Sequence, residues 1–302
     1  NRYQAVFTVP AFLVGSENVI CNPDNEDVLA YSLLLSQKTG LPVVSIFLSR
    51  TSISQTLKKS AFLYGPYNKP DAFLQSCDQH KDFLILSVPT ARPMYRGEEM
   101  IMQHCDTLYK HARFMICSIK ADTLKKLYAM TSVDVRQTST GRPLLWHDFS
   151  ENSSGQGYFT KGSSATFDLK QPAQAAELPL KSKVDTATEA EISFWYSDPH
   201  QDGLLRGSCE LVLLDSAGNV AGYDLGNLSL NMRQIDGRWG LYVKRMTIPP
   251  GAVKLRISLI HYELKINTIS VDNILVRSVS DDIILQGDIW FMKNNYFYKK
   301  NK

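Results

Sequence analysis

The feature that most constrains the fold is a change in the hydrophobic pattern near residue 140. Before it, short apolar runs such as Val43–Leu48 and Phe83–Val88 alternate with stretches at helical spacing such as Glu26–Lys38 and Gly97–His111. Strands that are apolar on both faces and alternate with helices are typical of a sheet covered by helices. Residues 1–140 therefore predict an open, mostly parallel α/β domain of about five strands.

After a linker predicted at residues 141–146, helical spacing almost disappears. Residues 147–302 show short alternating strands separated by turns rich in Gly, Asn, Asp and Pro. In Val253–Leu259 the odd positions are apolar and the even positions are polar, which is the pattern of a half-buried strand. This density of strands and turns predicts an antiparallel two-sheet sandwich of the jelly-roll type.

Charge and motifs exclude several classes of protein. The 33 basic and 30 acidic residues give a net charge of +3, so no nucleic-acid partner is indicated. No apolar run is long enough for a membrane helix. Dinucleotide, P-loop, nucleophile-elbow and zinc-protease motifs are missing, and the five cysteines form no C-x-x-C pair. Because the chain starts at Asn1, we expect a processed or truncated piece, with membrane contact only through a segment outside it.

Three segments of the second half carry a resemblance to a known family. They are the opening 147–149 (HDF), the strand 191–196 (EISFWY) and the closing strand 270–276 (SVDNILV). In these segments the chain resembles the jelly-roll, galactose-binding-like carbohydrate-binding modules that are often appended to bacterial glycan-processing proteins. The first half resembles extracytoplasmic regions of bacterial membrane proteins that take part in glycan assembly. The resemblance implies an extracytoplasmic location and a glycan or a protein as partner.

Sugar binding needs an exposed aromatic ring and polar groups for the hydroxyls. In the strand 190–197, Trp195 falls on the polar face, and Trp239 lies at a turn. The predicted ligand-binding set is Trp195, Trp239, Arg238, Asp224, Asn227 and Tyr242. In the alternative, both tryptophans are structural, with Trp195 packed under a neighbouring loop and Trp239 filling a strand end.

The resemblance also suggests calcium, because this family places its ions near the opening and closing strands. Carboxylates are the ligands that calcium prefers. The candidate ligands are Asp148, Glu151, Asp168 and Asp272. Alternatively, Asp272 bonds main-chain amides at a strand end.

A second hypothesis is enzymatic, with a site at the carboxyl ends of the strands in the α/β domain. Asp24 and Asp27 follow one predicted strand, and Arg92 and Arg96 follow another. These groups could transfer or hydrolyse a glycan or a phosphorylated sugar. In the alternative, the acids cap a helix and the arginines are neutralised by nearby glutamates.

The leading hypothesis is therefore a non-catalytic two-domain protein whose C-terminal jelly roll binds carbohydrate or docks a partner. The alternatives are the glycan-processing enzyme just described and a soluble structural region of a membrane-anchored, glycosyltransferase-like protein.

Overall fold

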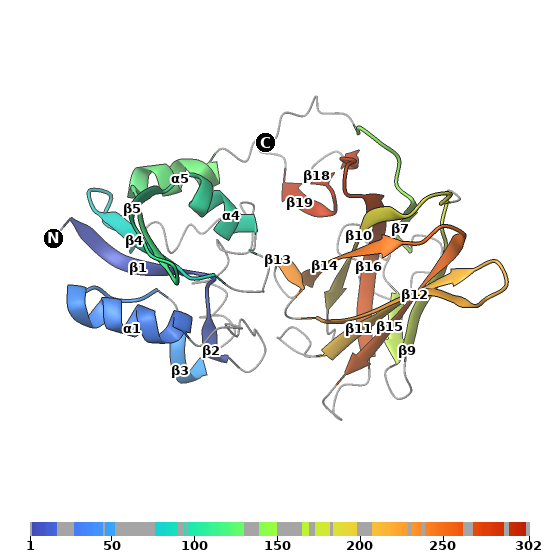
Figure 1. Ribbon diagram of the computed structural model, residues 1–302, viewed down its shortest axis with the longest axis horizontal. Helices are drawn as coiled ribbons and strands as arrows, with labels where there is room; N and C mark the ends of the chain where they lie inside the picture. The colour runs from blue at the N-terminus through green and yellow to red at the C-terminus, as the bar shows by residue number, and fades with distance from the viewer. Residues whose placement is uncertain are drawn as a thin grey trace. The chain divides into compact units, whose positions relative to one another are not determined.

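A computed structural model of the chain forms two compact units, Asn1–Val133 and Asp134–Lys302 (Figure 1). The described residues are 2–16, 27–44, 46–51, 76–89, 94, 96–129, 139–149, 165–168, 173–181, 184–197, 207–228, 231–236, 239–261, 268–286 and 290–299. The predicted linker 141–146 lies wholly inside the second unit. The strand β7 (Leu145–His147) pairs with β16 (Thr268–Ser278), and the N–H of Leu144 donates to the carbonyl of Val276 at 2.8 Å.

The first unit contains a mixed sheet rather than the mostly parallel one predicted. Its strand order is β1 (Tyr3–Val9), β4 (Asp82–Ser87), β6 (Met115–Ile119) and β5 (Asp106–Lys110). The pairing of β1 with β4 is parallel, as is that of β2 (Leu13–Ser16) with β3 (Ile46–Thr51). The pairing of β5 with β6 is antiparallel because a hairpin joins them, and the pairing of β4 with β6 is antiparallel as well.

Helices cover both faces of this sheet (Figure 1). They are α1 (Asp27–Thr39) on one face and α4 (Arg96–Gln103) and α5 (Ala121–Ala129) on the other. The helix predicted over Gly97–His111 ends at Gln103, and β5 takes its second half. The physical reason is that Thr107 and Tyr109 favour strands and pair with β6.

The second unit is a sandwich of two antiparallel sheets, which we name sheet I and sheet II. Sheet I has the order β13 (Met232–Asp236), β14 (Trp239–Ile248), β10 (Thr188–Ser197), β16 and β7, and β8 (Ala165–Asp168) also pairs with β16. Sheet II has the order β12 (Val220–Asn227), β11 (Gly207–Asp215), β15 (Ala252–His261) and β9 (Ala173–Pro179). The predicted β-sandwich is confirmed.

The core lies between the two sheets. The residues of β10 predicted to face it (Ala190, Ile192, Phe194 and Tyr196) are all completely buried. The ring of Phe194 stacks on that of Tyr242 with 4.8 Å between the centroids. From sheet II, the alternate residues Leu255, Ile257 and Leu259 of β15 complete the interior. The period-two pattern therefore identified the inner face of these strands correctly.

A small three-stranded meander follows the sandwich: β17 (Ile284–Gln286), β18 (Trp290–Lys293) and β19 (Tyr296–Lys299). The turn between β18 and β19 consists of Asn294 and Asn295, whose φ angles are 53° and 67°. Two successive left-handed residues match the tight turn that suits the twist of a hairpin, and Asn tolerates this conformation.

Candidate functional site

The outer face of sheet I, where the sequence predicted an exposed tryptophan, is closed. Trp195 is 0 % exposed and Trp239 is 7 % exposed. Together with Leu241 and Val243 they form a second apolar cluster, against which Tyr296 of the meander packs. Both tryptophans do lie off the main core, but their rings are covered and present no face for a sugar. The prediction that they form an exposed stacking platform is wrong, and the structural alternative holds.

The tip of the meander is hydrogen-bonded into this face. The indole N–H of Trp195 donates to the carbonyl of Asn295 at 3.1 Å. The side-chain amide of Asn295 donates to Oγ of Ser193 at 3.1 Å and to the carbonyl of Asn273 at 2.7 Å. Asn295 is itself 0 % exposed. The hairpin turn therefore covers the outer face of sheet I and is hydrogen-bonded to it.

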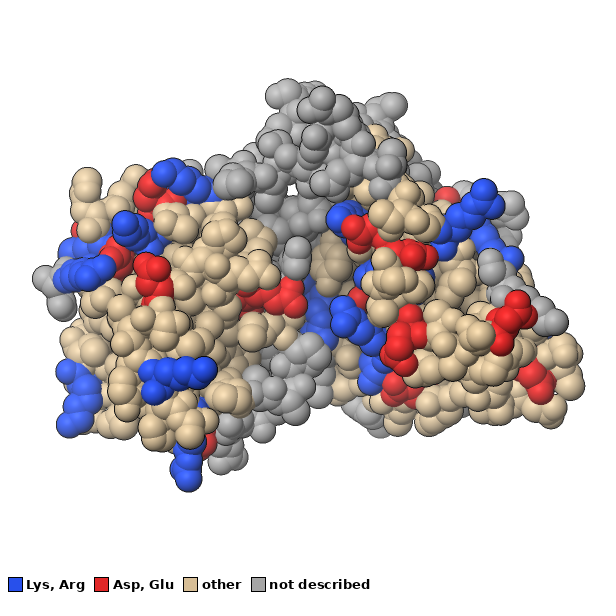
Figure 2. Space-filling view, turned by 45° about the horizontal axis from the view of Figure 1, so that its top comes forward, with Lys and Arg blue, Asp and Glu red and all other residues tan. Residues whose placement is uncertain are grey.

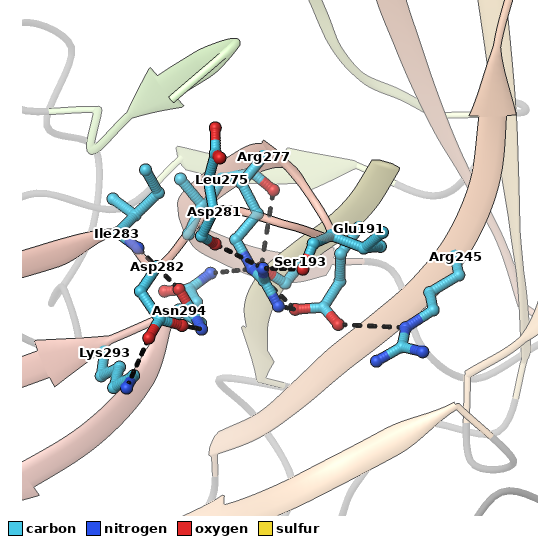
Figure 3. Close-up of polar contacts among 12 residues, drawn as sticks. Glu191, Ser193, Arg245, Leu275, Arg277, Asp281, Asp282, Ile283, Lys293 and Asn294 are labelled. Atoms are coloured by element: carbon cyan, nitrogen blue, oxygen red, sulfur yellow. Dashed lines mark hydrogen bonds and ion pairs between the residues drawn. The ribbon is translucent and has the colours of Figure 1, made fainter. Parts of the chain in front are cut away.

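A buried ion pair lies beside this hairpin turn (Figure 3). Nη2 and Nε of Arg277 donate to Oε1 of Glu191 at 2.8 and 3.1 Å, and both side chains are at most 7 % exposed. Nη1 of Arg277 also donates to the carbonyl of Asp281 at 2.6 Å, just before the meander begins. Arg245 approaches the other oxygen of Glu191 at 3.5 Å from the surface, where its side chain is 71 % exposed. We call Glu191 and Arg277 the clasp, because they tie sheet I to the start of the meander.

Three of the remaining residues of the predicted ligand set, Tyr242, Asp224 and Asn227, lie near one another between β12 and β14, but Tyr242 is buried there. Tyr242 is 0 % exposed inside the core, where burial raises the pKa of its hydroxyl well above the usual value. Asp224 forms an ion pair with Lys244 at 3.3 Å that joins the edge strand β12 of sheet II to β14 of sheet I. Asn227 accepts the side-chain amide of Asn231 with its main-chain carbonyl at 2.8 Å. Arg238 lies outside the described residues.

On the outer face of sheet II, the edge strand β12 is oriented in an unusual way. Val220, Tyr223 and Leu225 point outward and are 61, 58 and 51 % exposed. An antiparallel strand normally turns its apolar residues to the core and its polar ones to water. In β12 the positions facing inward are occupied instead by Gly222, Asp224 and Gly226.

Packing against the neighbouring elements explains these inward glycines. A Cβ at Gly226 would lie 2.3 Å from the hydroxyl oxygen of Tyr242. One at Gly222 would lie 3.1 Å from Cδ1 of Leu213. The inner side of β12 is therefore already filled from β14 and β11. On the other face of the sheet, Tyr223 and Val220 lie beside Val212 and Leu214 of β11, which are only 2 and 5 % exposed. Tyr223 and Val220 are themselves more than half exposed, and exposed apolar strips of this kind mark binding surfaces.

A row of neighbouring residues runs from Tyr223 across the outer face of sheet II and ends in two charged side chains. Strand register places Tyr223 next to Val212, Val212 next to Arg256, and Arg256 next to Glu177. With strands about 4.8 Å apart, Arg256 lies roughly 10 Å and Glu177 roughly 14 Å from Tyr223. Glu177 accepts from Nζ of Lys254 at 3.1 Å. We call Val220, Tyr223 and Leu225, with Arg256 and Glu177, the sheet II strip.

Sequence reasoning missed Tyr223. The signal was present in the run 220–227 (VAGYDLGN), where Gly and Asp alternate with Tyr and Leu. A strand that is glycine-rich on one side and apolar on the other is ambiguous, because the apolar side is normally assigned to the core. Only the register with β11 shows that this side faces solvent.

Of the predicted calcium ligands, Asp148 lies near Asp272, because His147 pairs with Ile274 in the antiparallel register of β7 and β16, whereas Asp168 lies farther along β16. Asp168 pairs with Thr268 on β16, which is four residues, or roughly 13 Å, from Asp272. Asp272 is buried, Asp148 is half-buried after β7, and Glu151 lies outside the described residues. Within the described part of the chain, no three His, Cys, Asp or Glu side chains are grouped as a metal site. Calcium therefore stays a prediction.

The predicted catalytic set of the first unit is only partly described. Asp27 is the first residue of α1, where an acid complements the helix dipole, as the structural alternative expected. Arg96 is the first residue of α4. Asp24 and Arg92 lie outside the described residues. The convergence that the enzymatic hypothesis requires thus stays a prediction.

Two general surface properties bear on partners. Figure 2 shows Lys and Arg interspersed with Asp and Glu on the face that it presents of each unit, without a continuous field of one sign. Among the described residues, no helix has the length and hydropathy that crossing a bilayer demands.

Comparison with known proteins gives a partial likeness in structure. No family model and no curated protein matches the chain. The CBM22-1 xylan-binding domain of Paenibacillus barcinonensis Xyn10C is similar at 17 % identity over 47 % of this chain and 98 % of that domain, with a TM-score of 0.34. The carbohydrate-binding module CBM6cm-2 of Cellvibrio mixtus lichenase 5A, in complex with cellotriose, is similar at 9 % identity over 46 % of this chain and 99 % of the module, with a TM-score of 0.25.

Tailspike protein 4 of bacteriophage CBA120 is also similar, at 13 % identity and a TM-score of 0.30 over 47 % of this chain. The match spans 19 % of that tailspike chain. At these identities and TM-scores, the likenesses carry no conclusion about a ligand.

Proposed function

We propose that this chain is a non-catalytic, extracytoplasmic two-domain protein whose C-terminal sandwich binds carbohydrate on the outer face of sheet II. The observation that carries the proposal is Tyr223, which is 58 % exposed on the outer face of sheet II, beside the buried Val212. An exposed tyrosine offers a flat apolar ring for the C–H face of a sugar and a hydroxyl for hydrogen bonds.

The neighbouring side chains suit a short oligosaccharide. Arg256 and Glu177 are a donor and an acceptor on the same row as Tyr223, at distances greater than one sugar ring. Leu225 extends the apolar surface along β12, perpendicular to that row. A ligand that touches the ring and both charged groups must therefore span more than one sugar unit.

The test is calorimetric titration of the whole chain with soluble bacterial and plant oligosaccharides. Tyr223→Ala should weaken binding about tenfold or more, and Tyr223→Phe should keep most of the affinity because the stacking face is retained. Tyr109→Ala is a matched control, because Tyr109 is a comparably exposed tyrosine (53 %) in the first unit. Equal affinity of Tyr223→Ala and the wild type would refute this site.

Docking of a protein partner is the second candidate, favoured by the exposed aliphatic side chains Val220 and Leu225 beside Tyr223. The same panel separates the two candidates. Binding to a sugar that Leu225→Ala leaves unchanged and Tyr223→Ala abolishes supports carbohydrate. A complete lack of binding across the panel moves the assignment to a protein partner.

A further inference from the structure

Sulfur-containing side chains gather on one face of the sheet in the first unit. On this face, apolar residues of β1, β4 and β6 pack against α4 and α5. The sulfur-containing side chains that belong to this cluster or pack against it are Cys77, Met100, Met102, Cys105, Met115 and Cys117. The cluster on the opposite face, which packs against α1, contains no sulfur among its described residues. Methionine fills gaps in many cores, so the cysteines are the members that packing explains least.

Two of these cysteines are neighbours across the hairpin of β5 and β6. Cys117 on β6 pairs with Thr107 on β5, and Cys105 lies two residues before Thr107. Side chains two residues apart on an extended chain share a face, so Cys105 and Cys117 are diagonal neighbours on the side of α4 and α5. The two thiols are close enough to affect each other: burial first, and then the thiol of Cys117, raise the pKa of Cys105 to about 12.

The atoms around the two thiols form a chain of weak contacts. Sγ of Cys117 donates to Oγ1 of Thr107 at 3.9 Å, and this hydroxyl donates to Sδ of Met115 at 3.7 Å. Sγ of Cys105 donates to the carbonyl of Met102 at 3.3 Å. Cys117 is buried, whereas Cys105 and Met115 are half-buried beside the exposed edge strand β5. The pair of thiols can therefore be reached from solvent at the edge of the sheet.

We propose that Cys105 and Cys117 bind one soft, thiophilic cation of the copper(I) class. On binding, each thiol releases its proton to water and each sulfur forms one bond to the ion, so the step needs neither an oxidant nor a reductant. Thiolate and thioether sulfur are the ligands that select copper(I), and Met115 places a thioether beside the pair. The carboxylate of Asp106, which acts on Cys105, adds negative charge that attracts a cation.

The spacing and number of the ligands favour such an ion over a disulfide or zinc. Diagonal neighbours on a sheet have Cβ atoms roughly 7 Å apart, whereas a disulfide requires about 3.5–4.5 Å. An ion between two sulfurs adds two bonds of roughly 2.3 Å each and spans the larger gap. Structural zinc needs four ligands. Among the residues that the structure describes, three His, Cys, Asp or Glu side chains are nowhere grouped for a metal, so a cation that two thiolates satisfy fits this pair.

The test is anaerobic titration of the whole, reduced chain with copper(I) in competition with a chromogenic copper(I) chelator. Cys105→Ser and Cys117→Ser should each weaken binding about 100-fold or more, because the loss of a direct ligand costs more than the roughly 10–100-fold typical of changes in the outer shell. Cys77→Ser is the matched control. Cys77 packs against the same cluster and is half-buried like Cys105, but it is not one of the proposed ligands, so this variant should keep the wild-type affinity.

Cys105→Ser is the decisive variant, because a half-buried position tolerates serine better than the fully buried Cys117. Far-UV circular dichroism confirms that each variant is folded, and X-ray absorption at the copper edge should show fewer sulfur neighbours in Cys105→Ser than in the wild type. Equal affinity of Cys105→Ser and the wild type, an equal loss in Cys77→Ser, or a disulfide-linked peptide of Cys105 and Cys117 in chain purified without reductant would overturn the proposal. The site lies in the other unit from the sheet II strip, so failure of the sugar titration would leave this result untouched.

Discussion

Removing Arg277 from the clasp should be among the most destabilising single changes in the sandwich. Glu191 and Arg277 are 6 and 7 % exposed, so truncation of the arginine leaves a carboxylate buried without its partner. Loss of one member of a buried pair costs about 3–5 kcal/mol. The same change removes the bond from Nη1 to the carbonyl of Asp281, which holds the start of the meander.

The chain supplies its own control for this prediction. Arg245 pairs with the same carboxylate at 3.5 Å, but its side chain is 71 % exposed. Arg245→Ala should therefore cost at most about 1 kcal/mol. Glu191→Gln combined with Arg277→Ala should recover part of the loss, because the uncompensated charge is then gone.

Tryptophan fluorescence is a suitable probe, because all four tryptophans lie in the second unit. At about 2–4 °C per kcal/mol for a domain of this size, Arg277→Ala should lower the Tm of the sandwich by roughly 6–20 °C. Urea unfolding gives the matching free energies. If Arg277→Ala and Arg245→Ala destabilise equally, the carboxylate is not buried as described and the reasoning fails.

Three further changes test other parts of the second unit. Gly226→Ala should cost about 1–3 kcal/mol in urea unfolding, because its Cβ would meet the hydroxyl of Tyr242; wild-type stability would mean that β12 is not packed as described. The hydrogen bond from Lys293 lowers the pKa of Asp282 below its ordinary value of 3.8, so this carboxylate stabilises the fold above that pH and the contribution disappears as pH falls through the lowered value. Asp282→Asn should therefore cost about a few tenths of a kcal/mol at neutral pH and progressively less as the pH falls below 3.8, and a cost that does not change with pH would contradict the ion pair. Burial raises the pKa of Cys209, so its thiol should react with a disulfide reagent only on unfolding, and labelling of the native chain would refute its burial.

Local periodicity was sufficient to predict the inner faces of the sandwich. In β10 the alternation of Ile192 and Phe194 with Glu191 and Ser193 identified the inner face correctly, because side chains of a strand point to alternate faces. The strand β5 was mistaken for helix, since Thr107–Lys110 follows a genuine helix without a Gly or Pro between them. The competing signal was pairing with β6, which is a tertiary contact and leaves no mark on the pattern of β5 alone.

The candidate site was harder to predict, because whether a sheet face is covered depends on contacts between residues that are far apart in the sequence. Parity correctly placed Trp195 on the outer face of β10, but the covering residue Asn295 is 100 positions away in the sequence. No local pattern reports that contact. The buried partners of Trp195 also explain why a tryptophan on a polar face is weak evidence for a ligand: an outer face becomes a core wherever a later segment packs on it.

The two outer faces of the sandwich therefore differ in how far packing accounts for the aromatic residue that each carries. On sheet I, Trp195 is explained by packing, since the meander covers its ring and Asn295 accepts its N–H. On sheet II, packing explains Tyr223 only in part, because it lies beside the buried Val212 but is itself more than half exposed. Apolar surface left in water contributes little to folding. An aromatic residue that packing leaves more than half exposed is the better candidate for binding, and this reasoning favours Tyr223 over both tryptophans as the ligand contact.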